Sequence, residues 1–186
     1  MKLLKKLPEK TKILITGGGG FIGGAVIRKI LKESDWKIYN LDKIGYASDL
    51  TSIENTILTL DSDKQERHEL LKVDLTNSSA TFEAVKYADP DLVMHLAAES
   101  HVDRSIKSPE IFITSNILGT FNILEATRDH YERLSLERKN KFRFLHISTD
   151  EVFGSLGKTG KFNEDSQYEP RSPYSASKAS SDHLVN

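Results

Sequence analysis

The chain has 186 residues, of which 38% are hydrophobic and 28% are charged, and its formal net charge is −1. These values are ordinary for one globular domain in water, and so small a charge gives no electrostatic attraction to nucleic acid or to an anionic membrane. The sequence has no cysteine, which excludes disulfides, a thiolate metal site and a cysteine nucleophile.

Residues 1–11 are predicted to be a short basic leader. The stretch is too short and too charged to be a signal peptide. No apolar run in the sequence approaches the length of a membrane span. We therefore expect a cytoplasmic protein that binds neither membrane nor nucleic acid, and we expect no metal site.

A glycine-rich turn stands between the first predicted strand and the first predicted helix. Residues 13–15 form an apolar burst typical of a buried parallel strand, and residues 21–31 have the apolar spacing of a helix. The glycines between them match a dinucleotide-binding turn in two registers: Gly17, Gly20 and Gly23, or Gly18, Gly20 and Gly23. The helix start would then face the pyrophosphate. An isolated match of this kind fits a turn without a ligand about equally well.

The second predicted strand, residues 38–42, ends in Asp42, nineteen residues after Gly23. A carboxylate at this place can accept hydrogen bonds from the adenosine ribose hydroxyls, and it repels a 2′-phosphate. Only Lys43, and no arginine, stands beside it. The position therefore favours NAD over NADP.

The third predicted strand covers residues 70–75, after a charged run over residues 61–69 that we interpret as solvated surface. Asp74 and Leu75 end the strand, where the aspartate could bond the adenine amino group. A helix cap or a turn is the more ordinary role for it, because polar residues follow. A helix is then predicted over residues 81–87.

The fourth predicted strand covers residues 91–98 and contains His95, which we interpret as a core histidine with its hydrogen bonds satisfied. The residues after it would lie at the carboxyl edge of the sheet, where ligands bind in open parallel sheets. Ala97 and Ala98 are small enough for close backbone approach to a cofactor, and Ser100 and His101 could contact cofactor or substrate. The alternative is that these residues only cap the next helix.

A long helix is predicted over residues 109–134, with Gly119 in its middle marking close packing. The fifth strand is expected over residues 142–149. A loop then leads to a helix that begins near Ser172 and continues to the last residue. Five strand–helix units with one glycine turn predict a doubly wound parallel sheet, an α/β fold of the Rossmann type.

Tyr174 and Lys178 stand four residues apart on this last helix and so share one face. A neighbouring ammonium favours the phenolate and is expected to lower the pKa of the tyrosine. Such a tyrosine can take a proton from a substrate hydroxyl while hydride leaves the same carbon for NAD. The alternative is two exposed helix residues with no chemical role.

The glycine turn, Asp42, the Asp74-Leu75 pair and the Y-x-x-x-K motif together resemble the extended short-chain dehydrogenase/reductase family. More narrowly, residues 95–106, 148–154 and 172–185 are similar to the dTDP-glucose 4,6-dehydratases. The Thr-Asp-Glu triplet at residues 149–151 is the specific part, because the related epimerases usually place small or hydroxyl residues there. The resemblance begins at the first strand and continues to Asn186.

The resemblance implies a hydro-lyase that oxidises C4 of dTDP-glucose, eliminates water across C5 and C6, and returns hydride to C6. It implies Asp150 as the acid, which must stay protonated near neutral pH, and Glu151 as the base; adjacent carboxyls can divide such roles where their environments differ. Thr149 would bond the C4 hydroxyl beside Tyr174. Without the resemblance, two loop carboxylates at a helix start would be the simpler interpretation.

The resemblance also implies a set of cofactor contacts and a homodimer. The dimer would form through the helix over residues 109–134 and the helix after Tyr174, and Ser100 and Thr149 would touch the substrate. The residues expected along NAD are Gly17, Gly20, Phe21, Ile22, Gly23, Asp42, Lys43, Tyr46, Asp74, Leu75, Leu96, Ala97, Ala98, Ser100, Ser115, Tyr174 and Lys178.

The sequence departs from the family at its end. It stops at Asn186, inside the helix that carries Lys178, whereas family members continue into a smaller domain that grips the nucleotide and the sugar. We expect residues 1–186 to form the NAD-binding domain alone, to bind NAD weakly and to turn over little or no substrate. An epimerase or decarboxylase of the same family, and a non-catalytic NAD-binding module, are the alternatives.

Overall fold

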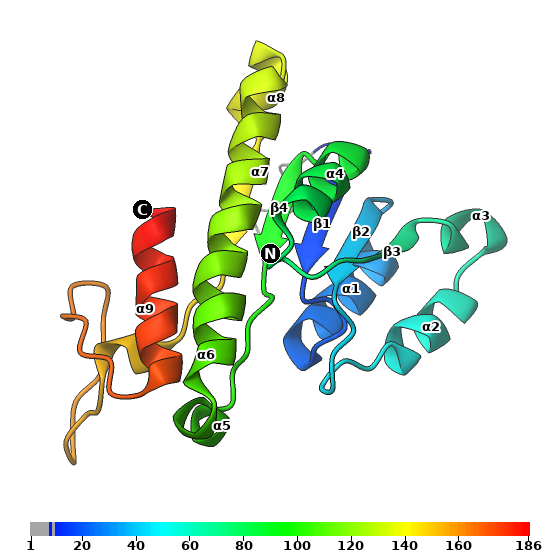
Figure 1. Ribbon diagram of the computed structural model, residues 1–186. Coiled ribbons are helices and arrows are strands. Elements are labelled where there is room, and N and C mark those ends of the chain that lie inside the picture. Colours follow the sequence, from blue (N-terminus) through cyan, green and yellow to red (C-terminus); the bar gives the residue numbers. More distant parts are fainter. Residues whose placement is uncertain (1–7, 9) are drawn as a thin grey trace.

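The computed structural model describes residue 8 and residues 10–186, so the predicted leader lies largely outside the described residues. These residues form one five-stranded sheet with the strand order β3-β2-β1-β4-β5, and every paired strand is parallel (Figure 1). The chain moves outward from β1 to β3 and then crosses to β4 on the other side of β1. This arrangement confirms the predicted doubly wound α/β fold.

The first two strands are slightly longer than the runs that predicted them, and the other three are shorter. They are β1 (Lys12–Thr16), β2 (Lys37–Asp42), β3 (His68–Lys72), β4 (Leu92–His95) and β5 (Arg143–His146). Thr16 pairs with His95, and His95 pairs with His146. After Thr16 the chain enters the glycine turn, so the residues that follow β4 and β5 lose a regular partner. The predicted strand ends at Ala98 and Thr149 are therefore three residues too late.

Helices connect the strands and cover both faces of the sheet. They are α1 (Phe21–Glu33), α2 (Thr51–Leu58), α3 (Ser62–Gln65), α4 (Ser78–Ala88), α5 (Val102–Lys107), α6 (Pro109–Phe112), α7 (Gly119–Arg133), α8 (Leu136–Lys141) and α9 (Pro173–Val185), with a π-helical turn η2 (Ile113–Leu118) and a 3₁₀ turn η3 (Asp150–Phe153). Among the described residues, no helix combines the length and the apolar character needed to cross a membrane.

Successive residues of β1 point to opposite faces of the sheet and pack into two hydrophobic cores, as expected for a strand covered on both faces. Ile13 and Ile15 pack with α1 residues such as Ile27 on one face. Leu14 packs with residues of α4 and α7 on the other. His95 is fully buried between Thr16 Oγ1 and Thr120 Oγ1, at 2.7 and 2.9 Å from its two ring nitrogens, which confirms its interpretation as a satisfied core histidine.

The charged run over residues 61–69 is only partly the solvated surface that was predicted. It contains α3, and it also contains the start of β3, where His68 pairs with Ile38 of β2. The predicted third strand, residues 70–75, was therefore placed two residues too late. The charged residues did not indicate a strand, because the start of β3 is determined by pairing with β2 and not by an apolar side-chain pattern.

The long helix predicted over residues 109–134 is present as a continuous run of α6, η2 and α7. The π turn in its middle was not predicted. Gly119 follows that turn directly, and a Cβ placed there would lie 3.3 Å from Leu75 Cβ. Gly119 therefore marks close packing against the segment after β3, as expected.

Candidate cofactor and active site

A cavity of about 450 Å³ opens at the carboxyl edge of the sheet, among the loops that follow β1, β2, β3 and β4 and the start of α9. This is the edge at which ligands bind in open parallel sheets. All the residues expected along the cofactor line this one cavity: Gly17, Gly20, Phe21, Ile22, Gly23, Asp42, Lys43, Tyr46, Asp74, Leu75, Leu96, Ala97, Ala98, Ser100, Ser115, Tyr174 and Lys178.

The glycine turn forms the floor of the cavity between β1 and α1. Gly17 has φ +73°, and a Cβ there would lie 2.7 Å from the backbone of Ala97. A Cβ at Gly23 would lie 2.2 Å from the carbonyl oxygen of Gly17. A Cβ at Gly18 would lie 2.0 Å from Asn40 Oδ1, so glycine is favoured at the first position of both registers, and Gly17 alone of the two also has a positive φ. Gly20 begins α1 without a side-chain cap, which leaves the helix start suited to an anion.

Asp42 is buried and already carries three hydrogen bonds within the chain. Its Oδ2 accepts from the Gly19 N–H at 2.8 Å. Its Oδ1 accepts from the Ile44 N–H at 2.7 Å and from Ser48 Oγ at 3.1 Å. The carboxylate thus ties the glycine turn to the loop after β2, and its remaining lone pairs face the cavity that it lines.

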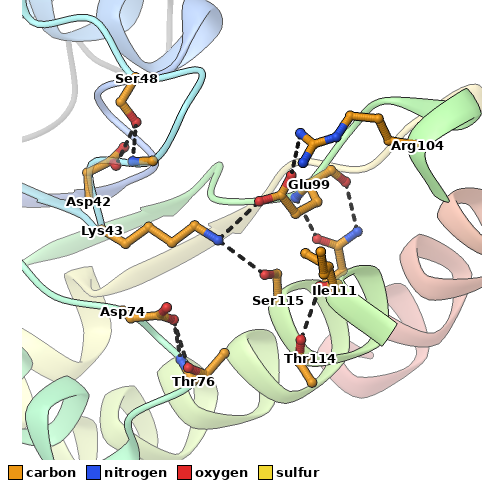
Figure 2. A network of polar contacts seen from close by, with 12 residues as sticks. Asp42, Lys43, Ser48, Asp74, Thr76, Glu99, Arg104, Ile111, Thr114 and Ser115 are labelled. Carbon is orange, nitrogen blue, oxygen red and sulfur yellow. Dashed lines mark hydrogen bonds and ion pairs between the residues drawn. The ribbon is translucent and has the colours of Figure 1, made fainter. Parts of the chain in front are cut away.

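Asp74 has the turn role that the sequence offered as the more ordinary one, and it also lines the cavity. Its Oδ1 accepts from both the N–H and the hydroxyl of Thr76 at 2.9 Å, so it is a turn residue (Figure 2). It also lines the cavity beside Leu75. The turn role is therefore present in the structure, and a contact with adenine stays a prediction.

Several lining residues were not predicted, and Glu99 is the most informative of them. Its side chain is only 11% exposed and lies 3.0 Å from Lys43 Nζ and 3.7 Å from an Arg104 guanidinium nitrogen (Figure 2). Asn116, in the π turn, accepts from the Glu99 N–H at 2.8 Å and donates to its carbonyl at 2.9 Å. In the sequence, the signal that could have pointed to Glu99 is its acidic side chain between Ala98 and Ser100, two residues already expected to contact the cofactor. The other unpredicted lining residues are Leu41, Gly45, Ala47, Ser48, Val73, Ile147 and Ser148, while His101, which the sequence offered as a possible contact, also lines the cavity.

Tyr174 and Lys178 are both buried on one face of α9 and both line the cavity. The helix begins at a capping box, in which Ser172 and Ser175 bond each other's backbone. Pro173 at the first helical position supports the same start. Lys178 Nζ donates to the Ile147 carbonyl at 2.7 Å, and burial lowers its pKa. The alternative of two exposed helix residues is therefore wrong.

The expected pKa shift of Tyr174 is wrong in direction. Burial raises its pKa, and the charges of Glu151, Asp150 and Asp182 raise it further, while the Thr149 hydroxyl beside it acts the other way. Sequence spacing identified Lys178 as a neighbour. It did not show that the phenol would be buried among carboxylates.

Thr149, Asp150 and Glu151 follow β5 after two intervening residues and are not among the cavity-lining residues. Thr149 caps the η3 turn through a 3.3 Å bond from the Glu151 N–H to its Oγ1. Asp150 and Glu151 are exposed on that turn. The triplet therefore lies near Tyr174, which the Thr149 hydroxyl contacts, and the described residues leave Asp150 exposed to solvent.

Asp182, one turn after Lys178, is a site residue that the sequence did not indicate. It accepts from His146 Nε2 and Tyr168 Oη at 3.0 Å each, and from Ser148 Oγ at 2.5 Å. Burial alone would raise the pKa of its carboxyl, but these donors lower it below its ordinary value. Asp182 thereby joins the end of β5 and the loop before α9 to the helix that carries Tyr174.

Residues 14–186 match the GDP-mannose 4,6 dehydratase family along nearly the whole described chain. The chain belongs to this family. Among curated family relatives, dTDP-glucose 4,6-dehydratase of Neisseria meningitidis is 51% identical over 175 residues, covering 94% of this chain and 48% of the relative. The enzyme of the same name from Salmonella typhimurium is 47% identical over 183 residues, covering 94% and 49%. The chain thus spans about half the length of these relatives.

Solved structures share the fold. The dTDP-glucose 4,6-dehydratase of Streptomyces venezuelae, solved with NAD bound, has a TM-score of 0.78 at 32% identity, covering 93% of this chain and 50% of that one. A UDP-Glc/GlcNAc 4-epimerase from Campylobacter jejuni has a TM-score of 0.79 at 26% identity, covering 94% and 48%. Dehydratases and epimerases have this half in common, so the fold does not distinguish between the two activities.

Proposed function

We propose that the complete gene product is an NAD-dependent nucleotide-sugar 4,6-dehydratase that acts on dTDP-glucose, a cytoplasmic hydro-lyase of deoxysugar biosynthesis. One observation carries the proposal. Tyr174 and Lys178 line the same cavity as the glycine turn. The Thr149–Glu151 triplet, which comes shortly after β5, lies near that tyrosine.

The cavity fits a dinucleotide. Gly17 and Gly23 are positions where any side chain would collide with backbone, and the uncapped start of α1 is suited to a pyrophosphate. Asp42 would accept from the adenosine ribose, and Lys178 would hold the nicotinamide ribose. When bound, NAD supplies the acceptor for a hydride, the returning hydride and a positive charge on its oxidised ring.

The residues of this chain would then divide the proton transfers. Tyr174 would remove the proton of the C4 hydroxyl, with Thr149 bonding the same oxygen. Because burial and nearby carboxylates raise the pKa of the phenol, its ionisation near neutral pH requires added positive charge. Glu151 would take the C5 proton and Asp150 would protonate the departing C6 hydroxyl, a role that requires the sugar to exclude water from the exposed η3 turn.

The direct test incubates the complete gene product with dTDP-glucose in deuterated water. We expect a product lighter by one water, with deuterium at C5. A product of unchanged mass would indicate the epimerase alternative, and the absence of any turnover would favour a non-catalytic NAD-binding module. For residues 1–186 alone we expect weak NAD binding and little turnover, and calorimetry that showed tight dTDP-glucose binding to them would contradict this.

A homodimer is the assembly that the helices support best. The run from α6 to α7 packs against α9 on one side of the sheet (Figure 1). Large apolar side chains on this run remain exposed, among them Ile113 and Phe121. Light scattering of the complete gene product is expected to give the mass of a dimer, and Phe121→Lys is expected to shift it to a monomer.

A further inference from the structure

We propose that Glu99 is a residue that determines the choice between NAD and NADP, because it engages the cations beside the adenosine end of the cavity. The proposal rests on NAD binding as described above. NADP differs by a 2′-phosphate, which needs a positively charged partner next to the ribose. Binding of NADP therefore depends on which positively charged side chains lie next to the ribose and on the partners that they already have within the chain.

Lys43 is the cation that a 2′-phosphate would meet. It follows Asp42 directly and lines the cavity, where the described residues contribute Lys178 as the other lysine and no arginine. Lys178 belongs to α9 at the opposite end and donates to Ile147. Figure 2 shows Lys43 extended from the end of β2, with its Nζ 3.0 Å from Glu99 Oε1 and 3.4 Å from Ser115 Oγ. Its charge is thus paired with a carboxylate rather than presented to the ribose.

Arg104 is the second cation of this region, and Glu99 engages it too. Its guanidinium lies 3.7 Å from Glu99 Oε2 and 3.8 Å above the ring of Tyr46, another lining residue. The Glu99 carboxylate therefore forms ion pairs with both Lys43 and Arg104, the two positively charged side chains beside this end of the cavity. Together with Asp42, it makes the surroundings of the ribose unfavourable to an added phosphate.

Glu99 is held in place and does not need the cations to position it. Asn116 bonds both its N–H and its carbonyl, at 2.8 and 2.9 Å. The Asn116 side chain is itself fixed by a 2.9 Å bond to Ser177 Oγ on α9. Because the backbone of Glu99 is fixed on both sides, replacing its charge should release Lys43 and Arg104 without moving the loop.

The test uses the complete gene product and measures its dissociation constants by calorimetry at low salt for NAD, NADP, 5′-ADP and 2′,5′-ADP. The wild-type chain is expected to prefer NAD and 5′-ADP. Glu99→Gln is expected to shift the NADP-to-NAD affinity ratio toward NADP by about tenfold, with the same direction for the two ADP probes. The control Glu137→Gln, which removes an exposed partner of Lys141 far from the cavity, is expected to leave the ratio unchanged.

A double variant decides whether the released lysine is the cause. In Lys43→Gln/Glu99→Gln the gain for NADP should be largely lost. An unchanged ratio in Glu99→Gln, or a gain that persists in the double variant, would overturn the proposal. If the wild type binds neither NAD nor 5′-ADP, the proposed function fails and this inference fails with it. Thermal unfolding of each variant shows that the fold is intact.

Discussion

The two edges of the sheet use the same kinds of charged residue in opposite ways. At the amino edge, Arg138 bonds Asp89 and Asp91 at 2.8 and 2.9 Å, and Lys12 bonds Asp89 at 2.9 Å. At the carboxyl edge, Asp42, Lys43 and Glu99 surround a cavity. Charges at the first edge have their partners within the chain and fasten α8 to the starts of β1 and β4. Those at the second also have partners within the chain, but they line a cavity that can admit a ligand.

The comparison shows that residue type alone does not reveal function in this chain. Asp42 at the carboxyl edge and Asp89 at the amino edge each make two or more hydrogen bonds or ion pairs. Each edge also has a lysine near its aspartate. What differs is the space in front of the charge, which at the carboxyl edge is kept open by the glycine turn. The following variants separate the two edges, in order of expected effect.

Tyr174→Phe should have the largest effect on the carboxyl edge and none on the amino edge. In the complete gene product we expect turnover of dTDP-glucose to fall by about 10²- to 10⁴-fold, because the proton acceptor is lost while the ring stays in place. NAD affinity and thermal stability should change little. Unchanged turnover in a product assay would contradict the role of the phenol and favour a non-catalytic module.

Gly17→Ala should affect both binding and folding. The positive φ and the 2.7 Å approach to the Ala97 backbone leave no room for a methyl group, so we expect a loss of more than about 2 kcal/mol in the free energy of unfolding and weaker NAD binding. Gly157→Ala is the matched control, because a Cβ there meets nothing within 4 Å. Denaturant unfolding and calorimetry measure the two effects, and equal results for both variants would refute the steric argument.

Arg138→Met should weaken the amino edge alone. The guanidinium bonds two carboxylates and the carbonyls of Asp89 and Pro90 while partly buried, so we expect a loss of about 1–2 kcal/mol. Arg128→Met removes an exposed ion pair on α7 and should change the free energy of unfolding much less than Arg138→Met does. NAD affinity should be unaffected in both. A change in affinity with Arg138→Met would show that the two edges are coupled.

His68, at the amino end of β3, should make the free energy of unfolding depend on pH. Burial, helped by the charge of Lys37, lowers its pKa from 6.5 to about 4. As the pH falls below 6.5 the unfolded chain therefore takes up a proton before the folded chain does, and stability declines between pH 6.5 and about 4. His68→Gln should reduce this decline by at most about 3 kcal/mol, measured by denaturant unfolding at pH 7 and pH 4.5. His95, also buried with a lowered pKa, contributes the same trend in both proteins.

Local signals in the sequence predicted the sheet, its winding and part of the cavity wall, whereas lining residues such as Lys43, Tyr46 and Ser115 were implied by the family resemblance. Glycines at three-residue spacing, an aspartate after the second strand and a tyrosine–lysine pair on one helix face each require only their own element. Strand ends were predicted less well, since pairing with a neighbour decides them. The start of β3 at His68 and the end of β4 at His95 are examples.

Only the tertiary structure decided which charges meet. Glu99 binds a lysine 56 residues before it, and Asp182 binds His146, 36 residues before it. The pKa of Tyr174 is raised by burial and by the charges of Glu151 and Asp150 on the η3 turn and of Asp182 on its own helix. Spacing along one helix or strand is a local quantity that sequence carries, whereas burial and the sum of neighbouring charges arise only when distant segments pack together.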